Sequence, residues 1–466
     1  MRTFPAAIVL CLGSAGCWNG ELALHKPCEN DDQCGRGQTC EGGYCDGPPA
    51  GATDTASSTT ETGGSCEPPP PTTCDPSQRP STRTLEATEI VDELFSAPIA
   101  VVAGDFVGDG RTDLAALSFG SYGIILVEGT GGFPVVSTYQ QTQVTELVDL
   151  AVTDLEGDGS PEFLMLSELG SIEVVPWTRG ADAFSVGTVL DLPVTQDAFT
   201  LTVADLVGAD DLPELLVSTS TAIELVPNVG GAPSLLDVFQ IEGDFDEPWD
   251  TIVVGAGADR RILVPESDDA SVMDVANQVV SSFRIEGSTL AVAPPLGTTF
   301  QNPWALAEGD FLGDDELEIV VAERRLNLPS DDDLEPTTRP GRLRFFRLVD
   351  DVVTEVGEPL EVGVGPRALA AADLDCDGKT DLVLGNSGRP AMDDGQAQVL
   401  FGSCDAAASE ANLVDVPGVG GSGLRAASRL AVGDFDGDGL LEVAIPDLGD
   451  IASPGERIVL VGVEAP

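Results

Sequence analysis

The sequence predicts an all-β protein whose large domain is a seven-bladed β-propeller. Three observations lead to this prediction. From about residue 84, short apolar runs rich in Val, Leu and Ile are bounded by Gly and Asp, and no long segment has helical periodicity. A phrase rich in Asp and Gly recurs there, at intervals mostly near fifty or sixty residues. Such an interval holds about four short strands, which is the size of one propeller blade.

The composition excludes several classes of function. The 466 residues include 79 Asp and Glu against 22 Lys and Arg, which gives a formal charge of −57. This charge argues against nucleic acid and against an anionic membrane surface as partners, and it favours cations. The single histidine, His25, cannot build a Ser-His-Asp relay or a multi-His zinc centre.

The amino-terminal residues predict export. Residues 1–16 contain one charged residue, Arg2, and an apolar stretch too short to span a bilayer. The run Ser14-Ala15-Gly16-Cys17 resembles the cleavage box of bacterial lipoproteins, although that family usually has an aliphatic residue in place of Ser14. The resemblance implies lipidation at Cys17 and a place in the bacterial cell envelope, surface-exposed or periplasmic, with the lipid as the only contact with the membrane. The alternative is an ordinary secretory signal and a secreted protein.

The cysteines also fit an oxidising compartment. Of ten, Cys11 lies in the signal and Cys17 is the proposed anchor, which leaves an even number for disulfides. Segment 17–45 is Cys-rich and too short to bury a core, so two bridges are expected to staple it, with the connectivity open. Zinc is the weaker alternative, because no CxxC pair occurs. The residues expected in disulfides are Cys28, Cys34, Cys40 and Cys45 in that segment, then Cys66 with Cys74, and Cys376 with Cys404.

A linker and then the repeats follow. Residues 46–83 are rich in Gly, Pro, Ser and Thr and predict an unstructured spacer, so the propeller is expected over 84–466. Each copy of the repeated phrase lies between two apolar runs and predicts a hairpin between the first two strands of a blade. The copies at Asp205 and Asp244 are degenerate, one too long and one too short. The seven copies start at residues 105, 154, 205, 244, 310, 373 and 434.

The ring is predicted to close with a strand from the other end of the domain. After its loop, the last copy offers strands only from Leu441 and over Arg457–Val463. Residues 83–92 precede the first blade and belong to no other. We therefore expect them to form the fourth strand of blade seven, since a blade cannot bury both faces alone and seven must stack into one core.

The repeated phrases are similar to the FG-GAP (also called VCBS) repeats of the integrin α-subunit propeller and of many bacterial surface proteins. The resemblance covers roughly 84–466. It is strong in copies one, two, six and seven, moderate in five and weak in three and four. It implies a surface-anchored module for adhesion, ligand binding or scaffolding.

The loops of these repeats predict calcium sites. Carboxylates at positions 1, 3, 5 and 9 of a tight loop converge and repel one another. Gly at position 6 permits the turn, and the carbonyl of position 7 adds an oxygen, so the cage suits Ca²⁺ better than Mg²⁺. Three copies have an acid at each of positions 1, 3, 5 and 9. With the carbonyl donor of position 7 in fourth place, their predicted ligands are Asp154, Glu156, Asp158, Ser160 and Glu162; Asp373, Asp375, Asp377, Lys379 and Asp381; and Asp434, Asp436, Asp438, Leu440 and Glu442.

Two further copies predict weaker sites. Blade one lacks the ligand at position 3, where Val107 stands, and blade five has Leu312 there and Asp315 in place of the Gly. Three to five structural calcium ions are therefore expected, with copies three and four empty. The alternative is that the Asp-Gly turns are ordinary hairpin turns. The residues of the weaker sites are Asp105, Asp109, Arg111 (as carbonyl donor) and Asp113 in blade one, and Asp310, Asp314 and Glu318 in blade five.

The opposite face of the ring is expected to bind the partner. It carries the loops between second and third strands and between blades, of which the longest are predicted at 324–342, 386–396, 446–456 and 292–304. In the integrin-like family the corresponding face meets ligands, which suggests a protein or polysaccharide ligand for a monomeric protein; plain solvated loops are the alternative. Five arginines gather in these loops: Arg324, Arg325, Arg339, Arg342 and Arg389.

Two function classes follow from this sequence. The first is a non-catalytic binding module, and the second is a carbohydrate-active enzyme of the envelope, a metal-assisted lyase or a carboxylate hydrolase, because propellers also host chemistry. The single His lies outside the propeller, and Lys26 and Lys379 are the only lysines. The clustered acids already belong to the predicted ion cages. We therefore predict that the protein is not an enzyme.

Overall fold

The computed structural model divides the chain into two compact units, Trp18–Gly64 and the remainder. The first unit contains the hairpin of β1 (Thr39–Glu41) and β2 (Tyr44–Asp46), which sets Cys40 opposite Cys45 in its register. The predicted signal peptide, Cys17, the predicted linker after Asp46 and the other cysteines up to Cys74 lie outside the described residues. The structure describes residues 39–41, 44–46, 84–91, 94–118, 123–130, 132–140, 146–178, 183–185, 187–191, 197–207, 212–228, 233, 238–242, 248–255, 260–266, 278–287, 289–296, 300–314, 316–325, 339–349, 352–388, 395–402, 410–417, 424–427, 429–449 and 454–463.

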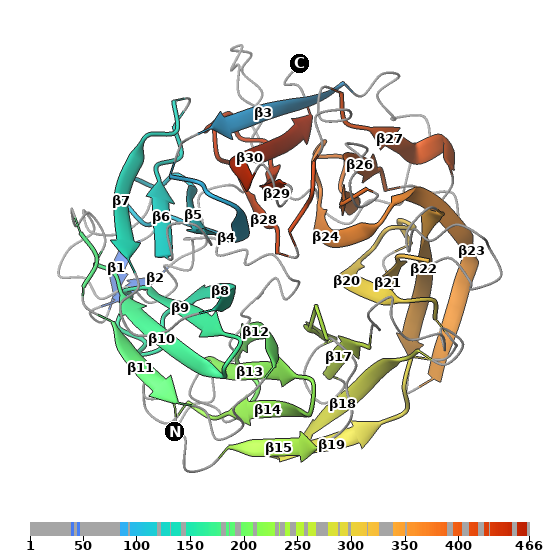
Figure 1. Ribbon diagram of the computed structural model, residues 1–466, viewed down its shortest axis with the longest axis horizontal. Helices are drawn as coiled ribbons and strands as arrows, with labels where there is room; N and C mark the ends of the chain where they lie inside the picture. The colour runs from blue at the N-terminus through green and yellow to red at the C-terminus, as the bar shows by residue number, and fades with distance from the viewer. Residues whose placement is uncertain are drawn as a thin grey trace. The chain divides into compact units, whose positions relative to one another are not determined.

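The large unit is a ring of seven antiparallel four-stranded sheets, which confirms the predicted seven-bladed β-propeller (Figure 1). The first three blades use the strands in chain order from the centre outward. Blade one consists of β4 (Pro98–Gly104), β5 (Asp113–Ser118), β6 (Gly123–Val127) and β7 (Val135–Gln140). Blade two consists of β8 (Leu147–Thr153), β9 (Glu162–Ser167), β10 (Ser171–Pro176) and β11 (Thr188–Asp191). Blade three consists of β12 (Ala198–Ala204), β13 (Glu214–Thr219), β14 (Ala222–Val226) and β15 (Phe239–Glu242).

The next three blades repeat this order. Blade four consists of β16 (Ile252–Val254), β17 (Arg261–Pro265), β18 (Val280–Glu286) and β19 (Thr289–Ala293). Blade five consists of β20 (Pro303–Gly309), β21 (Glu318–Glu323), β22 (Pro340–Val349) and β23 (Val352–Val364). Blade six consists of β24 (Pro366–Ala372), β25 (Asp381–Asn386), β26 (Gln396–Leu400) and β27 (Leu413–Asp415), with the 3₁₀ turn η4 (Glu410–Asn412) before its last strand.

Blade seven closes the ring with strands from both ends of the domain. It consists of β28 (Ala431–Gly433), β29 (Glu442–Gly449), β30 (Pro454–Val463) and β3 (Leu85–Val91). The two terminal strands pair antiparallel along their length, from Leu85 opposite Val463 to Val91 opposite Arg457. The prediction that residues 83–92 supply the missing fourth strand is therefore confirmed.

The core consists of seven apolar clusters, one between each pair of neighbouring blades. Successive side chains of a strand point to opposite faces of the sheet. In β5, Ala115 and Leu117 pack toward blade two, whereas Leu114 and Ala116 pack toward blade seven. Both faces of each blade are covered in this way, which explains why the inner strands are continuous apolar runs in the sequence.

Two expectations about the loops were wrong. The copy placed at Asp244 lies between β15 and β16, in the connection between blades, and the hairpin loop of blade four is the short segment 255–260. The predicted loop 446–456 is also shorter, because β29 runs to Gly449 and β30 starts at Pro454. Within the described part of the chain, no helix is long and apolar enough to cross a membrane.

Candidate metal centres

The acidic phrases of blades one, two, three, five, six and seven form the loops between the innermost and second strands, as predicted. The acid at position 9 is the first residue of the second strand in each of blades one, two, five, six and seven. The Gly at position 6 adopts a left-handed conformation, with φ of 82° at Gly378 and 93° at Gly439. Only Gly adopts such angles without steric cost, so this residue sets the turn that brings the acids together.

Blade seven has the most complete cluster of carboxylates. One oxygen from each of Asp434, Asp436, Asp438 and Glu442 lies within 4.8 Å of the others. Asp434 orders the loop by accepting the N–H groups of Gly437 at 2.8 Å and of Gly439 at 3.1 Å. Burial, together with the neighbouring carboxylates, raises the pKa of Glu442 to about 8. A divalent cation would stabilise the charged form of all four groups, and oxygen donors in this number suit calcium.

Blade six forms a second cluster, from Asp373, Asp375 and Asp377. Asp381 is not part of this group, and its two oxygens accept the N–H groups of Leu374 at 3.0 Å and of Gly402 at 2.8 Å. Lys379 was predicted to offer its carbonyl, and its side chain has a second role, with Nζ 2.8 Å from Oδ2 of Asp377. Cys376, within the same loop, is disulfide-bonded, while Cys404 lies outside the described residues.

In blades one and two, the acid at position 9 stabilises the loop by accepting hydrogen bonds from backbone N–H groups. Asp113 accepts the N–H groups of Phe106 at 2.7 Å, Val107 at 2.8 Å and Gly129 at 2.9 Å. Glu162 accepts the N–H of Leu155 at 2.8 Å, and burial raises its pKa to about 7. The position-5 acids accept the N–H of position 7 and thereby tighten the turn. These pairs are Asp109 with Arg111 at 3.0 Å and Asp158 with Ser160 at 2.8 Å.

The same backbone contact persists in blade three, where the copy of the phrase is degenerate. Glu214, at the start of β13, accepts the N–H groups of Leu206 at 2.6 Å and Val207 at 3.0 Å. Sequence analysis missed this residue because the loop is one residue longer than the others. The buried acid at the start of the second strand is therefore a structural feature of the hairpin, separate from its capacity to hold an ion.

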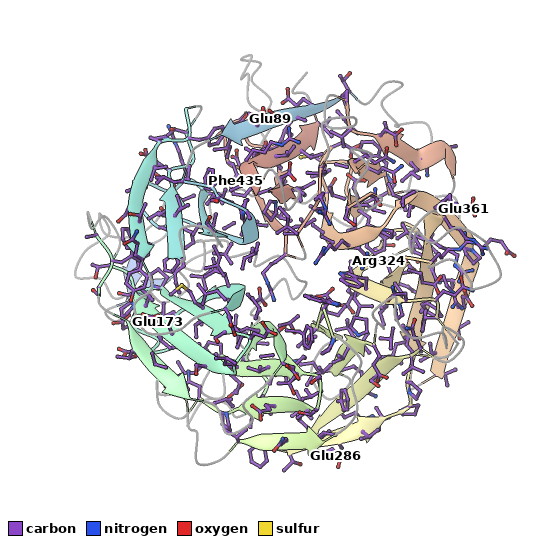
Figure 2. All side chains as sticks on the ribbon, viewed as in Figure 1. Glu89, Glu173, Glu286, Arg324, Glu361 and Phe435 are labelled. Atoms are coloured by element: carbon purple, nitrogen blue, oxygen red, sulfur yellow. The ribbon has the colours of Figure 1, made fainter. Side chains whose placement is uncertain are left out.

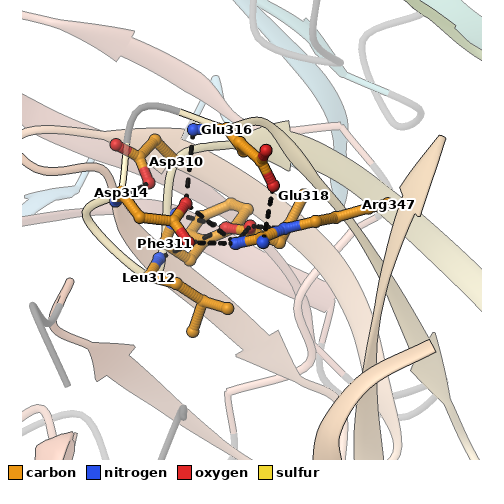
Figure 3. A network of polar contacts seen from close by, with 7 residues as sticks. All are labelled: Asp310, Phe311, Leu312, Asp314, Glu316, Glu318 and Arg347. Carbon is orange, nitrogen blue, oxygen red and sulfur yellow. Dashed lines mark hydrogen bonds and ion pairs between the residues drawn. The ribbon is translucent and has the colours of Figure 1, made fainter. Parts of the chain in front are cut away.

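In blade five, an arginine occupies the acidic loop. The guanidinium of Arg347, from β22, lies between the carboxylates of Asp314, Glu316 and Glu318 (Figure 3). Its Nε is 2.7 Å from Glu318 Oε1, its Nη1 is 2.7 Å from Glu316 Oε2, and its Nη2 is 2.7 Å from Asp314 Oδ2. The sequence predicts a calcium site from Asp310, Asp314 and Glu318 and gives no sign of Arg347, which lies 29 positions after Glu318.

The centre of the ring holds charged residues that the sequence did not point to. Arg429 donates from Nε to Asp149 Oδ1 at 2.6 Å and from Nη2 to Asp149 Oδ2 at 2.5 Å. Each of two buried acids also accepts an N–H of the next blade's innermost strand, Asp149 from Leu201 and Asp250 from Leu306, both at 2.8 Å. Burial raises the pKa of Asp250 to about 6.

Aromatic and basic side chains pack together at the start of the innermost strands, which is the end opposite the acidic loops. Trp249 and Trp304 are stacked, with centroids 5.1 Å apart and an angle of 12° between the rings. The guanidinium of Arg324 lies 4.0 Å from the centroid of Trp304, and that of Arg367 lies 5.3 Å from the same centroid. Arg324 is on the inner side of the ring near β20 (Figure 2). Phe199 meets Trp249 edge-on at 4.9 Å.

The structure thus separates the arginines that were predicted to gather on this face. Arg325 pairs with Glu361 at 2.8 Å, and Arg342 pairs with the buried Glu323, both within blade five. Arg339 directly precedes β22, and Arg389 lies outside the described residues. Arg324 stacks on Trp304, and Arg367, which the sequence did not suggest, completes the cluster.

No protein-family model and no curated protein matches the sequence. Three solved structures are similar in fold. BBS1N in complex with ARL6DN has a TM-score of 0.50 at 14% identity, over 83% of this chain and 98% of that one. The BP39L lectin from Burkholderia pseudomallei has a TM-score of 0.49 at 14% identity, over 76% and 97%. An α-L-arabinofuranosidase from Fusarium graminearum has a TM-score of 0.42 at 12% identity, over 69% and 93%. At 14% identity, the likeness to BBS1N shows the fold alone.

Proposed function

We propose that this protein is a calcium-stabilised, surface-anchored β-propeller of the FG-GAP type that acts as a non-catalytic binding module. The observation that carries the proposal is the blade-seven cluster, where four carboxylate oxygens lie within 4.8 Å of one another. Such mutual repulsion destabilises the hairpin unless a cation neutralises it. Bound calcium then contributes its binding free energy to folding.

Calcium removal tests this proposal directly. The melting temperature of the mature protein should fall by many degrees in chelator and recover on addition of millimolar Ca²⁺, with a weaker effect of Mg²⁺. Equilibrium dialysis should detect the bound ions independently of stability. Identical melting curves in both buffers, with no bound calcium, would refute the ion sites.

The binding face is proposed to be the one opposite the calcium loops. Trp304 is 4% exposed, and its indole N–H has no hydrogen-bond partner among the described residues. Arg324 and Arg367 lie beside it, on a chain that is otherwise strongly acidic. Guanidinium groups held on aromatic rings lose little entropy on binding a carboxylate or another planar anion. The similar chain BBS1N was crystallised in complex with ARL6DN, which is consistent with a propeller as a binding module.

Binding to envelope extract tests this face. An Arg324→Gln/Arg367→Gln variant should lose most of its retention of acidic envelope polysaccharide or protein, because it removes both cations next to the Trp pair. Arg325→Gln is the matched control, since Arg325 has the same charge and pairs with Glu361 at 2.8 Å. Equal retention by the double variant and the parent would exclude this face, and release of altered ligand would support the enzyme instead.

The location of the protein is proposed from Cys17 and the residues before it. A Cys17→Ser variant cannot be acylated and should move from the membrane fraction to the soluble fraction of the producing cell. Cys11→Ser, within the predicted signal, is the control and should leave the distribution unchanged. Membrane association of both variants at the level of the parent would contradict the lipid anchor.

A further inference from the structure

The strand register identifies one position in each blade that faces the position-9 acid. In blade five, Phe346 is opposite Ile319, so the next residue of β22, Arg347, faces Glu318. In blade seven, Val461 is opposite Val443, so Gly462 faces Glu442. A Cβ built on Gly462 would lie 3.0 Å from Cγ of Glu442, which shows that a side chain at this position is directed at the carboxylate.

Blade five differs from the other blades at this position. Among the described hairpins whose second strand begins with an acid, it alone has a basic residue there. The glycine of blade seven leaves room for the complete cluster of four carboxylates. The facing residues are Glu128, Pro176, Pro227, Arg347, Phe401 and Gly462 in blades one, two, three, five, six and seven.

The contacts of Arg347 are those of a bound cation. Its donors reach the carboxylates at positions 5, 7 and 9, with both oxygens of Asp314 at 2.7–2.8 Å from Nη2. The side chain of Glu318 is 0% exposed and that of Arg347 is 18% exposed. The side chains of Asp314 and Glu316 are 45% and 60% exposed, so the charge-assisted hydrogen bond to Glu318 is the one that is shielded from water. The loop also retains its internal bond from the N–H of Asp314 to Asp310 Oδ1, at 3.1 Å.

A second degenerate loop shows a related contact. Arg260, from the hairpin loop of blade four, donates from Nη1 to the backbone oxygen of Asp205, the residue that starts the loop of blade three. Arginines thus approach two of the loops in which the phrase departs from the calcium pattern, those of blades three and five.

We infer that Arg347 is a built-in replacement for the metal ion in blade five, and that its removal turns this loop into a calcium site. The inference deepens the proposed function, on which the calcium readout rests. The guanidinium supplies the positive charge that a bound ion would supply in blade seven. Because it belongs to the chain itself, this loop needs no ion from solution. Without it, the carboxylates of Asp314, Glu316 and Glu318 would lose the cation that they share, and with Asp310 of the same loop they would offer oxygen ligands of the kind that suits calcium.

An Arg347→Gln variant of the full chain tests the inference by ion stoichiometry and by melting. In chelator, the variant should melt at a lower temperature than the parent. In Ca²⁺, it should bind one equivalent more than the parent, by equilibrium dialysis, and regain most of the lost melting temperature. Arg325→Gln is the matched control, because it breaks another arginine–glutamate pair of blade five and should leave the stoichiometry unchanged.

A second variant keeps the test valid if Arg347→Gln fails to fold in chelator. Arg347→Gln/Glu316→Gln/Glu318→Gln removes the uncompensated carboxylates together with the arginine, and it should fold and bind the same number of ions as the parent. Equal stoichiometry in the parent and in the single variant would overturn the inference and leave the proposed calcium sites intact. A parent that binds no calcium, with a single variant that binds one equivalent, would support the inference and contradict the proposed function.

Discussion

Arg429 in blade seven and Asp149 in blade two form a two-pronged ion pair across the centre of the ring, although they lie 280 positions apart in the sequence. The same guanidinium donates to the backbone oxygen of Leu201 in blade three at 2.9 Å. Asp149 in turn accepts the N–H of Leu201 at 2.8 Å. One arginine thus ties blade seven to blades two and three, which are not its neighbours in the ring.

Breaking this pair should destabilise the ring. Arg429→Gln or Asp149→Asn leaves a buried charge without its partner, which costs about 3–5 kcal/mol of unfolding free energy. The double variant should lose less than the sum of the two single losses, because it removes both charges. Urea unfolding followed by tryptophan fluorescence measures each value. Additive losses would mean that the ion pair contributes nothing to stability.

Removal of the blade-seven acids should abolish one calcium site. An Asp434→Asn/Asp436→Asn/Asp438→Asn variant keeps the size of each side chain and removes the charges that attract the ion. It should bind one equivalent of Ca²⁺ fewer than the parent, and its melting temperature should depend less on calcium. The matched control changes three exposed acids outside the loops, Glu168, Glu286 and Glu358, to Gln. An unchanged stoichiometry in the loop variant would place the bound calcium elsewhere.

The closing strand should be essential for stability. Leu85 and Ile90 of β3 are buried in the clusters on the two sides of blade seven. Deletion of residues 83–92 exposes both clusters and the edge of β30, so the melting temperature should fall sharply. Leu85→Ala should cost about 2–5 kcal/mol by denaturant unfolding. Thr88→Ala, at an exposed position of the same strand, is the control and should have little effect. An unchanged melting temperature after the deletion would contradict closure by this strand.

A half-buried acid of blade five, Glu308, predicts a pH dependence. Burial raises the pKa of Glu308 from 4.5 to about 7, and its Oε1 accepts the N–H of Gly255 at 3.0 Å. Because the folded state holds this proton more tightly than the unfolded state, stability from this group falls as the pH rises from about 4.5 to about 7. Glu308→Gln keeps an acceptor oxygen and does not titrate. The variant should therefore gain in melting temperature over the parent across this pH range, at constant calcium. A difference independent of pH would show that Glu308 does not titrate there.

Much of the architecture follows from local sequence patterns. The period of the acidic phrase predicted the number of blades, and the shortage of strands after the last copy predicted the role of β3. The acids of blade seven are within nine residues of one another, so their spacing alone predicted that they converge. Asp244 shows the limit of this reasoning, because a degenerate phrase resembles any acidic loop, and the strand bounds place it between blades.

The sequence by itself determined the fold class, the closing strand and the loops that carry the acids, because each depends on residues that are neighbours along a strand or within one turn. Only the tertiary structure decided which charges meet. Arg347 reaches the loop of blade five because β22 pairs with β21, and Arg429 reaches Asp149 because the ring brings blades seven and two together. Such partners depend on strand register and on closure of the ring. Both are set by the packing of all seven blades and leave no local pattern in the chain.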